Sequence, residues 1–408
     1  MQTQSSMLTV AQALDSLLAE VQALAQIEHL PLIEAQGRVL AEPQFAALSV
    51  PPMDNTQMDG YAVRAQDCIS GSACLPVSQR IAAGYVGHEL QPGTAARIFT
   101  GANIPSGADA VVMQELCSLQ DGMVTIKYQP KVGEWIRRIG EDIQQGSQIL
   151  PAGCRLRAQE LGLAASVGIA NLPVRRRLKA AVFFTGDELA MPGEALRPGA
   201  IYNSNRFCIN ALLQKMGCEV SDFGIVPDSL EATRATLRQA AQEHDVIITS
   251  GGVSVGEEDH VKPAVQAEGE LKPWQIALKP GKPLAFGTVR RTQSESAYFL
   301  GLPGNPVSSF VTFLLFVRPF ILRLQGQTEL TPRSYTMRAD FAWPKADKRN
   351  EFLRARLNAQ GGLDLFPHQG SAVLRSMVWC DGLIDNPPGN PIAVGDMVKF
   401  LPFSDLMN

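Results

Sequence analysis

The sequence predicts a multidomain α/β protein built on a central, doubly wound α/β domain with a mostly parallel sheet. Three observations indicate this fold class. The chain has 408 residues, which is long for a single hydrophobic core. Its middle part alternates short β-branched runs with helical patterns, as repeated βα units do. On both sides of that part, short apolar runs separated by Gly, Pro, Asn and Asp are typical of small β domains.

We expect four domains along the chain. The Pro51-Pro52 pair marks the first change of pattern, where a part with mixed α and β structure gives way to a compact β domain. The chain then returns to the mixed part before it enters the central domain, and its last part suggests a small barrel. The expected domains are a linker domain (1–52 with 143–177), an inserted small β domain (53–142), the central α/β domain (178–328) and a C-terminal β-barrel-like domain (329–408).

The outer elements follow from local signals. An apolar stripe predicts a helix over Thr9–Leu24, and Thr9 with Gln12 forms a capping box at its start. A helix rich in small residues is expected over Ala158–Val167. The segment Arg175–Arg177 is predicted to be a solvated linker rather than a binding patch, because three charges make a weak field.

The elements of the central domain are expected to alternate. Strands are expected over Ala180–Phe184, Val220–Val226, Asp245–Ile248 and Tyr298–Leu302. Helices are expected over Asn205–Met216, Leu230–Gln242 and Val307–Leu324. In the C-terminal domain, strands are expected over Ser334–Phe341, Phe352–Leu357, Val373–Trp379 and Pro391–Phe400. Ligands of doubly wound sheets bind at the carboxyl ends of the strands, so a site is expected at that edge.

Composition excludes several classes of function. Hydrophobic residues make up 45% of the chain, as in soluble globular proteins, and the formal net charge of -4 argues against a nucleic-acid or anionic-membrane partner. No secretory signal pattern is evident, and the longest apolar stretch, Phe310–Leu324, contains charged residues and a proline, so we expect a cytoplasmic protein. Seven cysteines without a Cys-x-x-Cys pair favour neither a disulfide framework nor a zinc site.

A glycine turn follows one of the expected strands. The β-branched run Val246–Ile248 leads into Thr249-Ser250-Gly251-Gly252. Glycine accepts positive φ and lets the backbone approach a ligand, while the amides of such a loop point outward as anion donors. The alternative is an ordinary strand-to-helix turn, in which the acidic residues Glu257, Glu258 and Asp259 favour the start of a helix.

Polar residues gather at the carboxyl ends of the expected parallel strands. They are Glu188, Asp228, Ser250, Gly251, Gly252, Asp259 and Asn305. Carboxylates alone would repel a phosphate, whereas Mg²⁺ is held by one or two carboxylates together with phosphate oxygens. The pattern therefore predicts a site for a metal-bound phosphate.

Two further groups of polar residues need an explanation. Lys279 and Lys282 lie in a loop stiffened by two prolines, which makes a compact cationic pocket suited to a small oxyanion. The alternative is an exposed turn whose lysines extend into solvent. In the inserted domain, three turns carry Asp59, Thr100 and Asp142, and local backbone hydrogen bonds are the ordinary role of such residues.

Seven motifs occur in a characteristic order along the chain. They are Met58-Asp59-Gly60-Tyr61-Ala62-Val63, Thr100-Gly101-Ala102, Arg138-Ile139-Gly140-Glu141-Asp142, Thr185-Gly186-Asp187-Glu188-Leu189, Ser250-Gly251-Gly252-Val253-Ser254-Val255-Gly256, Lys279-Pro280-Gly281-Lys282-Pro283 and Leu302-Pro303-Gly304-Asn305-Pro306-Val307-Ser308. Together they resemble the MoeA family of molybdopterin molybdenumtransferases, which includes the E domain of gephyrin. The resemblance covers nearly the whole chain.

The resemblance implies a Mg²⁺-dependent reaction in which adenylylated molybdopterin and molybdate give molybdenum cofactor and AMP. It also implies a homodimer in which the linker domain serves dimerisation and the inserted domain of the partner subunit completes the cleft of the central domain. A molybdopterin adenylyltransferase is the enzymatic alternative, although such proteins lack the flanking β domains and the paired lysines. A non-catalytic scaffold of the gephyrin E-domain type is the alternative from another class, which no feature of the sequence supports or excludes.

The resemblance also implies roles for single residues. The catalytic residues would be Asp59, Thr100, Asp142, Glu188 and Asp259. The pterin nucleotide phosphate would be bound by Ser250, Gly251, Gly252, Asp228 and Asn305. Molybdate would be bound by Lys279, Lys282, Pro283, Ser308, Arg354 and Ser371, and Mg²⁺ by Glu188, Asp228 and Asp259. The chain departs from the family pattern at Phe184, Thr56-Gln57 and Ser229, and the last departure weakens the case for Asp228 as a ligand.

Overall fold

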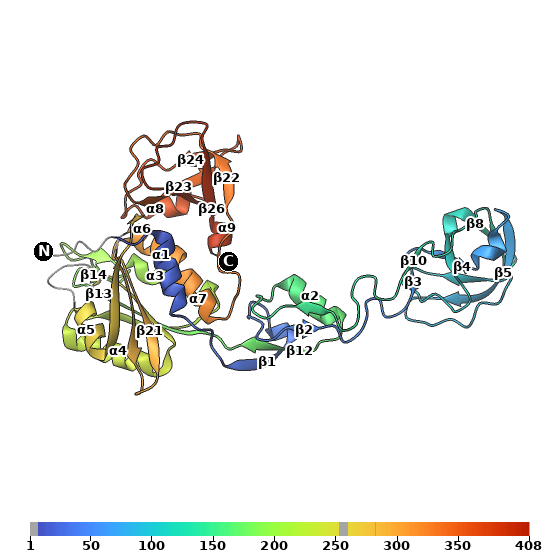
Figure 1. Cartoon of the computed structure of the whole chain (residues 1–408), viewed down its shortest axis with the longest axis horizontal. Helices are drawn as coiled ribbons and strands as arrows, with labels where there is room; N and C mark the ends of the chain where they lie inside the picture. Colours follow the sequence, from blue (N-terminus) through green and yellow to red (C-terminus); the bar gives the residue numbers. More distant parts are fainter. Residues whose placement is uncertain (1–6, 253–259, 282, 408) are drawn as a thin grey trace.

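The computed structural model describes residues 7–252, 260–281 and 283–407. The molecule is elongated, with two domains at one end, a narrow linker region in the middle and a β domain at the far end (Figure 1). The chain passes through the linker region twice, once on the way to the far β domain and once on the way back. As a result, the first helix (residues 10–19) lies beside the central domain, although the linker region and the far β domain separate the two in sequence.

The central domain holds a six-stranded sheet with the order β16-β13-β17-β21-β20-β18. Four consecutive strands of the sheet run parallel to one another, and they are β13 (Lys179–Thr185), β16 (Glu219–Val226), β17 (Val246–Ser250) and β21 (Ser296–Leu302). The other two, β20 (Pro283–Arg290) and β18 (Gly269–Gln275), pair antiparallel. The sequence did not predict β18, because this polar edge strand contains a proline and lacks the β-branched pattern of a buried strand.

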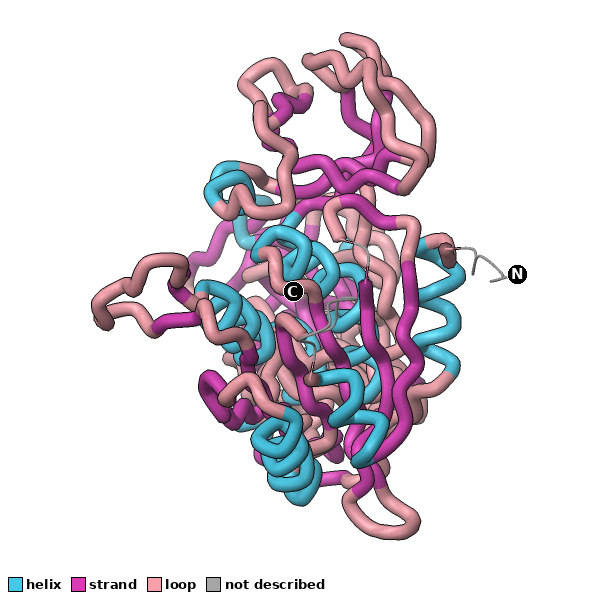
Figure 2. The backbone as a smooth tube through the Cα atoms, turned by 90° about the vertical axis from the view of Figure 1, so that its left-hand side faces the viewer, coloured by secondary structure: helices cyan, strands magenta, loops and turns pink. Residues whose placement is uncertain are grey.

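Helices cover both faces of this sheet (Figure 2). Along β13, Val182 and Phe184 face one core, and Ala181 and Phe183 face the other. The first face is covered by α1 (Val10–Ala19), α3 (Ser204–Lys215), α6 (Pro306–Thr312) and α7 (Arg318–Leu324). The second face is covered by α4 (Leu230–Glu243) and α5 (Val261–Glu268). Strand residues therefore point alternately into two apolar layers, as in a doubly wound fold.

Two of these helices differ from the sequence-based expectation. The helix α1 ends at Ala19 rather than Leu24, and its capping box of Thr9 and Gln12 is confirmed. Although the sequence assigned this helix to the linker domain, its apolar stripe packs on the central sheet. The long helix Pro306–Leu324 contains a π-helical segment at Phe313–Val317. By length and composition it is able to cross a membrane, but 83% of its apolar window is buried, so it is a core helix.

The linker region is a thin layer of paired strands with one helix. Strand β1 (Ile27–Pro31) pairs antiparallel with β12 (Asn171–Arg175), and β2 (Gln44–Phe45) with β11 (Gln148–Leu150). A short 3₁₀ turn (Leu32–Glu34) and the helix α2 (Ala158–Ser166) complete it. Its core is small and includes Leu40, Leu156 and Leu172.

The inserted β domain is a six-stranded sheet with the order β7-β4-β6-β5-β9-β8. Its strands are β4 (Gly60–Val63), β5 (Ala73–Ile81), β6 (Ala95–Ile98), β7 (Ala110–Met113), β8 (Cys117–Gln120) and β9 (Met123–Ile126). The short pair β3 (Asn55–Thr56) and β10 (Ile136–Arg137) closes the domain, and 3₁₀ turns occur at Ala65–Cys68 and Gln114–Leu116. Two apolar clusters lie on the two faces of the sheet.

The C-terminal domain holds a third six-stranded sheet, with the order β19-β23-β25-β26-β22 and β24 beside β23. Its elements are β19 (Leu278–Lys279), β22 (Tyr335–Arg338), β23 (Asn350–Leu357), β24 (Leu363–Leu365), β25 (Gly382–Asn386), β26 (Met397–Pro402), α8 (Arg375–Trp379) and α9 (Phe403–Leu406). The strand predicted over Val373–Trp379 is wrong, because this segment forms α8. Its helical period buries Ser376 and Met377 together and leaves Val378 87% exposed.

Candidate active site

A cavity of about 950 Å³ opens at the carboxyl ends of the central parallel strands. Its wall combines the loop after β13, the start of α3, the turn after β17 and the loop after β21 with residues 279–281 and with residues of the C-terminal domain. Eight of the residues expected in the site line this cavity, namely Glu188, Ser250, Gly251, Gly252, Lys279, Asn305, Ser308 and Ser371. The fold thus brings together groups from five separate stretches of sequence.

The glycine turn adopts the conformation that the sequence predicted. Gly251 and Gly252 have φ values of 98° and 64°, which side chains rarely tolerate. A Cβ atom at Gly252 would lie 2.5 Å from a methyl carbon of Val261, and one at Gly251 would lie 3.0 Å from the Thr185 carbonyl oxygen. Only glycine therefore fits both positions, and the bare backbone forms this part of the wall.

Asn205 and Ser250 tie the ends of two strands together. The Asn205 Nδ2 atom donates to the Ser250 hydroxyl at 2.6 Å and to the Gly304 carbonyl at 2.7 Å. The Ser250 hydroxyl in turn donates to the Pro303 carbonyl at 3.1 Å. The hydroxyl of Ser250 is thus engaged within the wall, and the Gly251 amide likewise donates to the Leu302 carbonyl at 3.1 Å.

Sequence reasoning missed the contribution of the α3 N-terminus. This helix follows a short parallel pair formed by β14 (Leu189–Ala190) and β15 (Ile201–Tyr202), which lies along the cavity. The Asn203 side chain caps the helix by accepting from the Arg206 amide at 3.1 Å. The Nδ2 atom of Asn203 is buried and has no hydrogen-bond partner among the described residues. An Asn before a helical pattern is a capping signal, and it was the available sequence cue.

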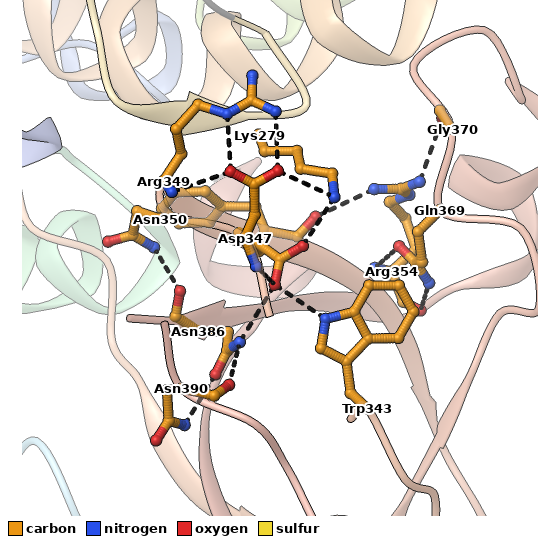
Figure 3. A network of polar contacts seen from close by, with 12 residues as sticks. Lys279, Trp343, Asp347, Arg349, Asn350, Arg354, Gln369, Gly370, Asn386 and Asn390 are labelled. Atoms are coloured by element: carbon orange, nitrogen blue, oxygen red, sulfur yellow. Dashed lines mark hydrogen bonds and ion pairs between the residues drawn. The ribbon is translucent and has the colours of Figure 1, made fainter. Parts of the chain in front are cut away.

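Lys279 belongs to a network that joins the central and C-terminal domains (Figure 3). Its ammonium lies 3.0 Å from Glu351 Oε1 and 3.3 Å from Asp347 Oδ2. Glu351 is completely buried, and it also accepts from the Trp343 indole at 2.8 Å. Arg349 forms two hydrogen bonds of 3.0 Å with the Asp347 carboxylate. Donation by Arg349 and Lys279 holds the pKa of Asp347 well below its usual range, although partial burial opposes this shift.

Arg349 also lines the cavity, and the sequence did not identify it as a site residue. Among the lining residues that the structure describes, Lys279 and Arg349 are the cations, and Glu188 is the carboxylate. Both cations are already paired with Asp347 or Glu351. The cationic wall is therefore oriented by buried carboxylates, and no sequence pattern near Lys279 indicated this.

Arg354 lies behind the cavity wall. It is fully buried, and its guanidinium donates to the Phe352 carbonyl at 3.1 Å, the Gly370 carbonyl at 3.2 Å and the Ser376 hydroxyl at 3.3 Å. Desolvation lowers the pKa of Arg354 to about 10. Through Gly370, this side chain supports the loop that carries Ser371 to the cavity.

The remaining expected residues of this site have other positions. Asp228 follows β16, is half-buried and is not among the residues that line the cavity. Pro283 is the first residue of β20. Asp259 and Lys282 lie outside the described residues. The structure therefore gives no geometry for one of the expected acids and one of the expected lysines.

Mg²⁺ is compatible with this wall in one mode of binding. Within the described ranges, no group of three or more His, Cys, Asp or Glu side chains is placed to hold a metal ion. Glu188 supplies one carboxylate, and it folds back over Gly186, where a Cβ atom would lie 2.5 Å from its Oε2 atom. One carboxylate suits a Mg²⁺ that is bound together with phosphate oxygens and water, rather than a cage made by the protein alone.

Asp59, Thr100 and Asp142 do not reach this cavity within one chain. Asp59 precedes β4 at the far end of the molecule (Figure 1), and its Oδ1 atom accepts from the amide and the hydroxyl of Thr100, both at 2.7 Å. These hydrogen bonds, the amide first, lower the pKa of Asp59. Asp142 lines a separate cavity of about 510 Å³ with Pro51 and Arg137.

Comparisons with known proteins cover almost the whole chain. The family model of the MoeA N-terminal region (domain I and II) matches residues 8–168. The model of a probable molybdopterin binding domain matches residues 181–323, and the model of the MoeA C-terminal region (domain IV) matches residues 336–403.

Individual proteins give the same result. The chain is 41% identical to a molybdopterin molybdenumtransferase of Haemophilus influenzae, over 98% of this chain and 100% of that protein. It is 38% identical to a molybdopterin molybdenumtransferase of a Nostoc species, over 88% of this chain and 83% of that protein. The crystal structure of the molybdopterin biosynthesis moeA protein from Pyrococcus horikoshii superimposes with a TM-score of 0.85 at 27% identity, and covers 97% of this chain and 100% of that one.

Proposed function

Because this chain belongs to the MoeA family of molybdopterin molybdenumtransferases, we propose that it inserts molybdenum in molybdenum cofactor biosynthesis. The proposed reaction transfers molybdate to adenylylated molybdopterin and releases AMP. The observation that carries the proposal is that a glycine turn suited to phosphate and a cationic wall suited to an oxyanion face the same cavity. An enzyme of this type needs both groups within reach of one substrate.

The described residues have distinct tasks in this reaction. The backbone at Gly251 and Gly252 would bind the phosphates of the pterin nucleotide, since no side chain blocks their approach. Lys279 and Arg349 would hold the tetrahedral molybdate dianion next to the dithiolene sulfurs, where positive charge and N–H donors stabilise it. Ser308 and Ser371 add hydroxyl groups to the same wall. No side-chain nucleophile is required.

Mg²⁺ bound with the phosphates would draw charge off the phosphoanhydride as it breaks. Glu188 is the described side chain that is placed to hold such an ion at the cavity. Asp259, which the family resemblance adds as a second acid, lies outside the described residues.

We further propose that two copies of the chain form the functional, cytoplasmic enzyme. Asp59 and Thr100 form a hydrogen-bonded pair at the far end of the molecule, and donation by the Thr100 amide and hydroxyl favours the ionised form of the Asp59 carboxylate. In a homodimer the inserted domain of the partner would bring Asp59, Thr100 and Asp142 to the cavity that holds Glu188. This explains how residues at opposite ends of one chain serve one reaction (Figure 1).

The reaction is tested by incubating the purified protein with adenylylated molybdopterin and Mg²⁺, with and without molybdate. We expect AMP release to require molybdate. AMP release at the same rate without molybdate would exclude molybdenum insertion. Formation of the adenylylated pterin from molybdopterin and ATP would support the adenylyltransferase alternative.

The shared site is tested by mixing two inactive variants. Asp59→Asn and Glu188→Gln are each expected to abolish turnover with little change in thermal stability. After unfolding and refolding as an equimolar mixture, half of the dimers contain one chain of each type, and each has one intact site. We therefore expect about a quarter of the wild-type activity to return. A mixture as inactive as its components would rule out a site completed by the partner.

A further inference from the structure

A second cavity, of about 80 Å³, lies where the linker region meets the central domain. Five arginines line it, namely Arg38, Arg155, Arg175, Arg176 and Arg177, and we call it the arginine cavity. It lies on the connection from β12 to β13 and is bordered by the end of α3, at Met216 and Gly217. The sequence predicted a solvated linker at Arg175–Arg177. That prediction is wrong for Arg175 and Arg176, which are half-buried and hydrogen-bonded.

Two of the five arginines are neutralised by carboxylates. Arg38 is buried and forms an ion pair with Glu28. Arg176 forms two hydrogen bonds with the Asp245 carboxylate, at 2.6 Å and 2.7 Å. These ion pairs hold two of the arginine side chains in place. The positive charge of the arginine cavity therefore comes from the other three arginines.

The other three arginines have no carboxylate partner in the described part of the chain. Arg175 donates to the Leu24 carbonyl at 2.8 Å. Arg155 makes one hydrogen bond, of 3.3 Å, to the Lys215 carbonyl at the end of α3. The Arg177 guanidinium has no hydrogen-bond partner among the described residues, and it is exposed at the edge. Neutral carbonyls do not cancel a full positive charge, so these three arginines leave positive charge around a small space.

The partial burial of Arg155 makes this arrangement unfavourable without an anion. Desolvation lowers the pKa of Arg155, and no acid opposes that shift. A half-buried guanidinium retains strong donors that water satisfies less well than an oxyanion does. Three guanidinium groups around one small space match the donor pattern that binds tetrahedral oxyanions.

We propose that the arginine cavity binds a small tetrahedral oxyanion between Arg155, Arg175 and Arg177. Inorganic phosphate and molybdate share this chemistry, and both are candidates. Because Arg155 belongs to the linker region and Arg177 leads into the central sheet, the bound anion ties these two parts of the molecule together. The site is separate from the cavity at the carboxyl ends of the strands and does not depend on the function proposed for it.

Isothermal titration of the full-length protein tests the site, with phosphate and molybdate titrated in separate experiments. The variant Arg155→Gln with Arg177→Gln removes two uncompensated charges without breaking an ion pair. We expect its affinity for the anion to fall by at least about tenfold. Arg157→Gln is the matched control, because Arg157 is exposed, pairs with Glu160 and does not line the arginine cavity. It should bind as the wild type does.

Arg349→Gln separates this site from the first cavity, since it changes only the cationic wall there. The proposal is supported if the double arginine variant loses anion binding while Arg349→Gln retains it. The anion that binds, phosphate or molybdate, then identifies the ligand. Equal binding by wild type and the arginine variant would overturn it, as would no binding of either anion to the wild type up to about 10 mM. Thermal unfolding without anion checks that the variants are folded. If the double variant is not folded, the single variant Arg177→Gln replaces it, because Arg177 is exposed.

Discussion

Lys279 and Glu351 are register partners on the parallel strands β19 and β23, and the Lys279 ammonium donates to the buried Glu351 carboxylate at 3.0 Å. The pair joins a segment of the central domain to the C-terminal domain. Glu351 is completely buried, whereas a third of the Lys279 side chain (34%) is exposed. Loss of either partner therefore has a different consequence, because water can solvate the lysine but not the glutamate.

We predict that Lys279→Met destabilises the protein more than Glu351→Gln does. The first change leaves a buried carboxylate without its main cation, which costs about 3–5 kcal/mol. The second leaves a lysine that still has Asp347 and solvent, at a cost of about 1–3 kcal/mol. Urea unfolding of both variants and of the double variant measures these effects. The double variant should lose less than the sum, and strict additivity would show that the two side chains do not interact.

Arg349→Gln should raise the KM for molybdate about tenfold, because it removes one of the two described cations of the cavity wall. The KM for the pterin nucleotide should change little, since the glycine turn is intact. Steady-state AMP release at varied molybdate measures both constants. Arg356→Gln is the control, because Arg356 is exposed and stacks on Trp379 away from the cavity. If the KM for molybdate did not change, Arg349 would serve only to position Asp347 and would not bind molybdate.

Gly252→Ala should weaken binding of the pterin nucleotide. Its φ of 64° disfavours a side chain, and the added methyl group would meet Val261, so the turn must shift at a cost of about 1–3 kcal/mol. Equilibrium binding of the nucleotide and urea unfolding measure the two effects. Gly162→Ala is the matched control, because Gly162 lies within α2 with no atom near its Cβ position. There alanine should stabilise the helix by about 1 kcal/mol. Equal behaviour of the two variants would contradict the role of the turn.

The ionised Asp347 carboxylate should stabilise the folded protein at neutral pH and lose this effect as the solution becomes acidic. Its pKa in the folded protein is lowered from 3.8 by Arg349 and Lys279, so the folded state favours the ionised carboxylate. The contribution is fully present above 3.8 and is lost as the pH falls below that value toward the folded pKa. Asp347→Asn should therefore be less stable than the wild type at pH 6, and the difference should shrink towards pH 3. Urea unfolding across this range measures it, and a gap independent of pH would mean that the ionised form is not favoured.

Features of the fold that arise within a few residues could be predicted from the sequence. The parallel strands around Val246–Ile248, the capping box of Thr9 and the positive φ of Gly251 and Gly252 all follow from short patterns. Each pattern fixes a backbone conformation through steric and hydrogen-bonding preferences of neighbouring residues. The order of strands then placed Glu188 and Asn305 at the same edge as the glycine turn.

Contacts between distant parts of the chain depend on how the whole molecule packs and could not be predicted in this way. It paired Lys279 with Glu351, which lies 72 residues away, and it brought Arg349 to the cavity while placing Arg354 behind its wall. It also set Asp59 at the far end of the molecule from Glu188 (Figure 1). Such pairings depend on the register between strands of different domains and on which charges become buried. Those quantities are properties of the packed molecule, and no short stretch of sequence contains them.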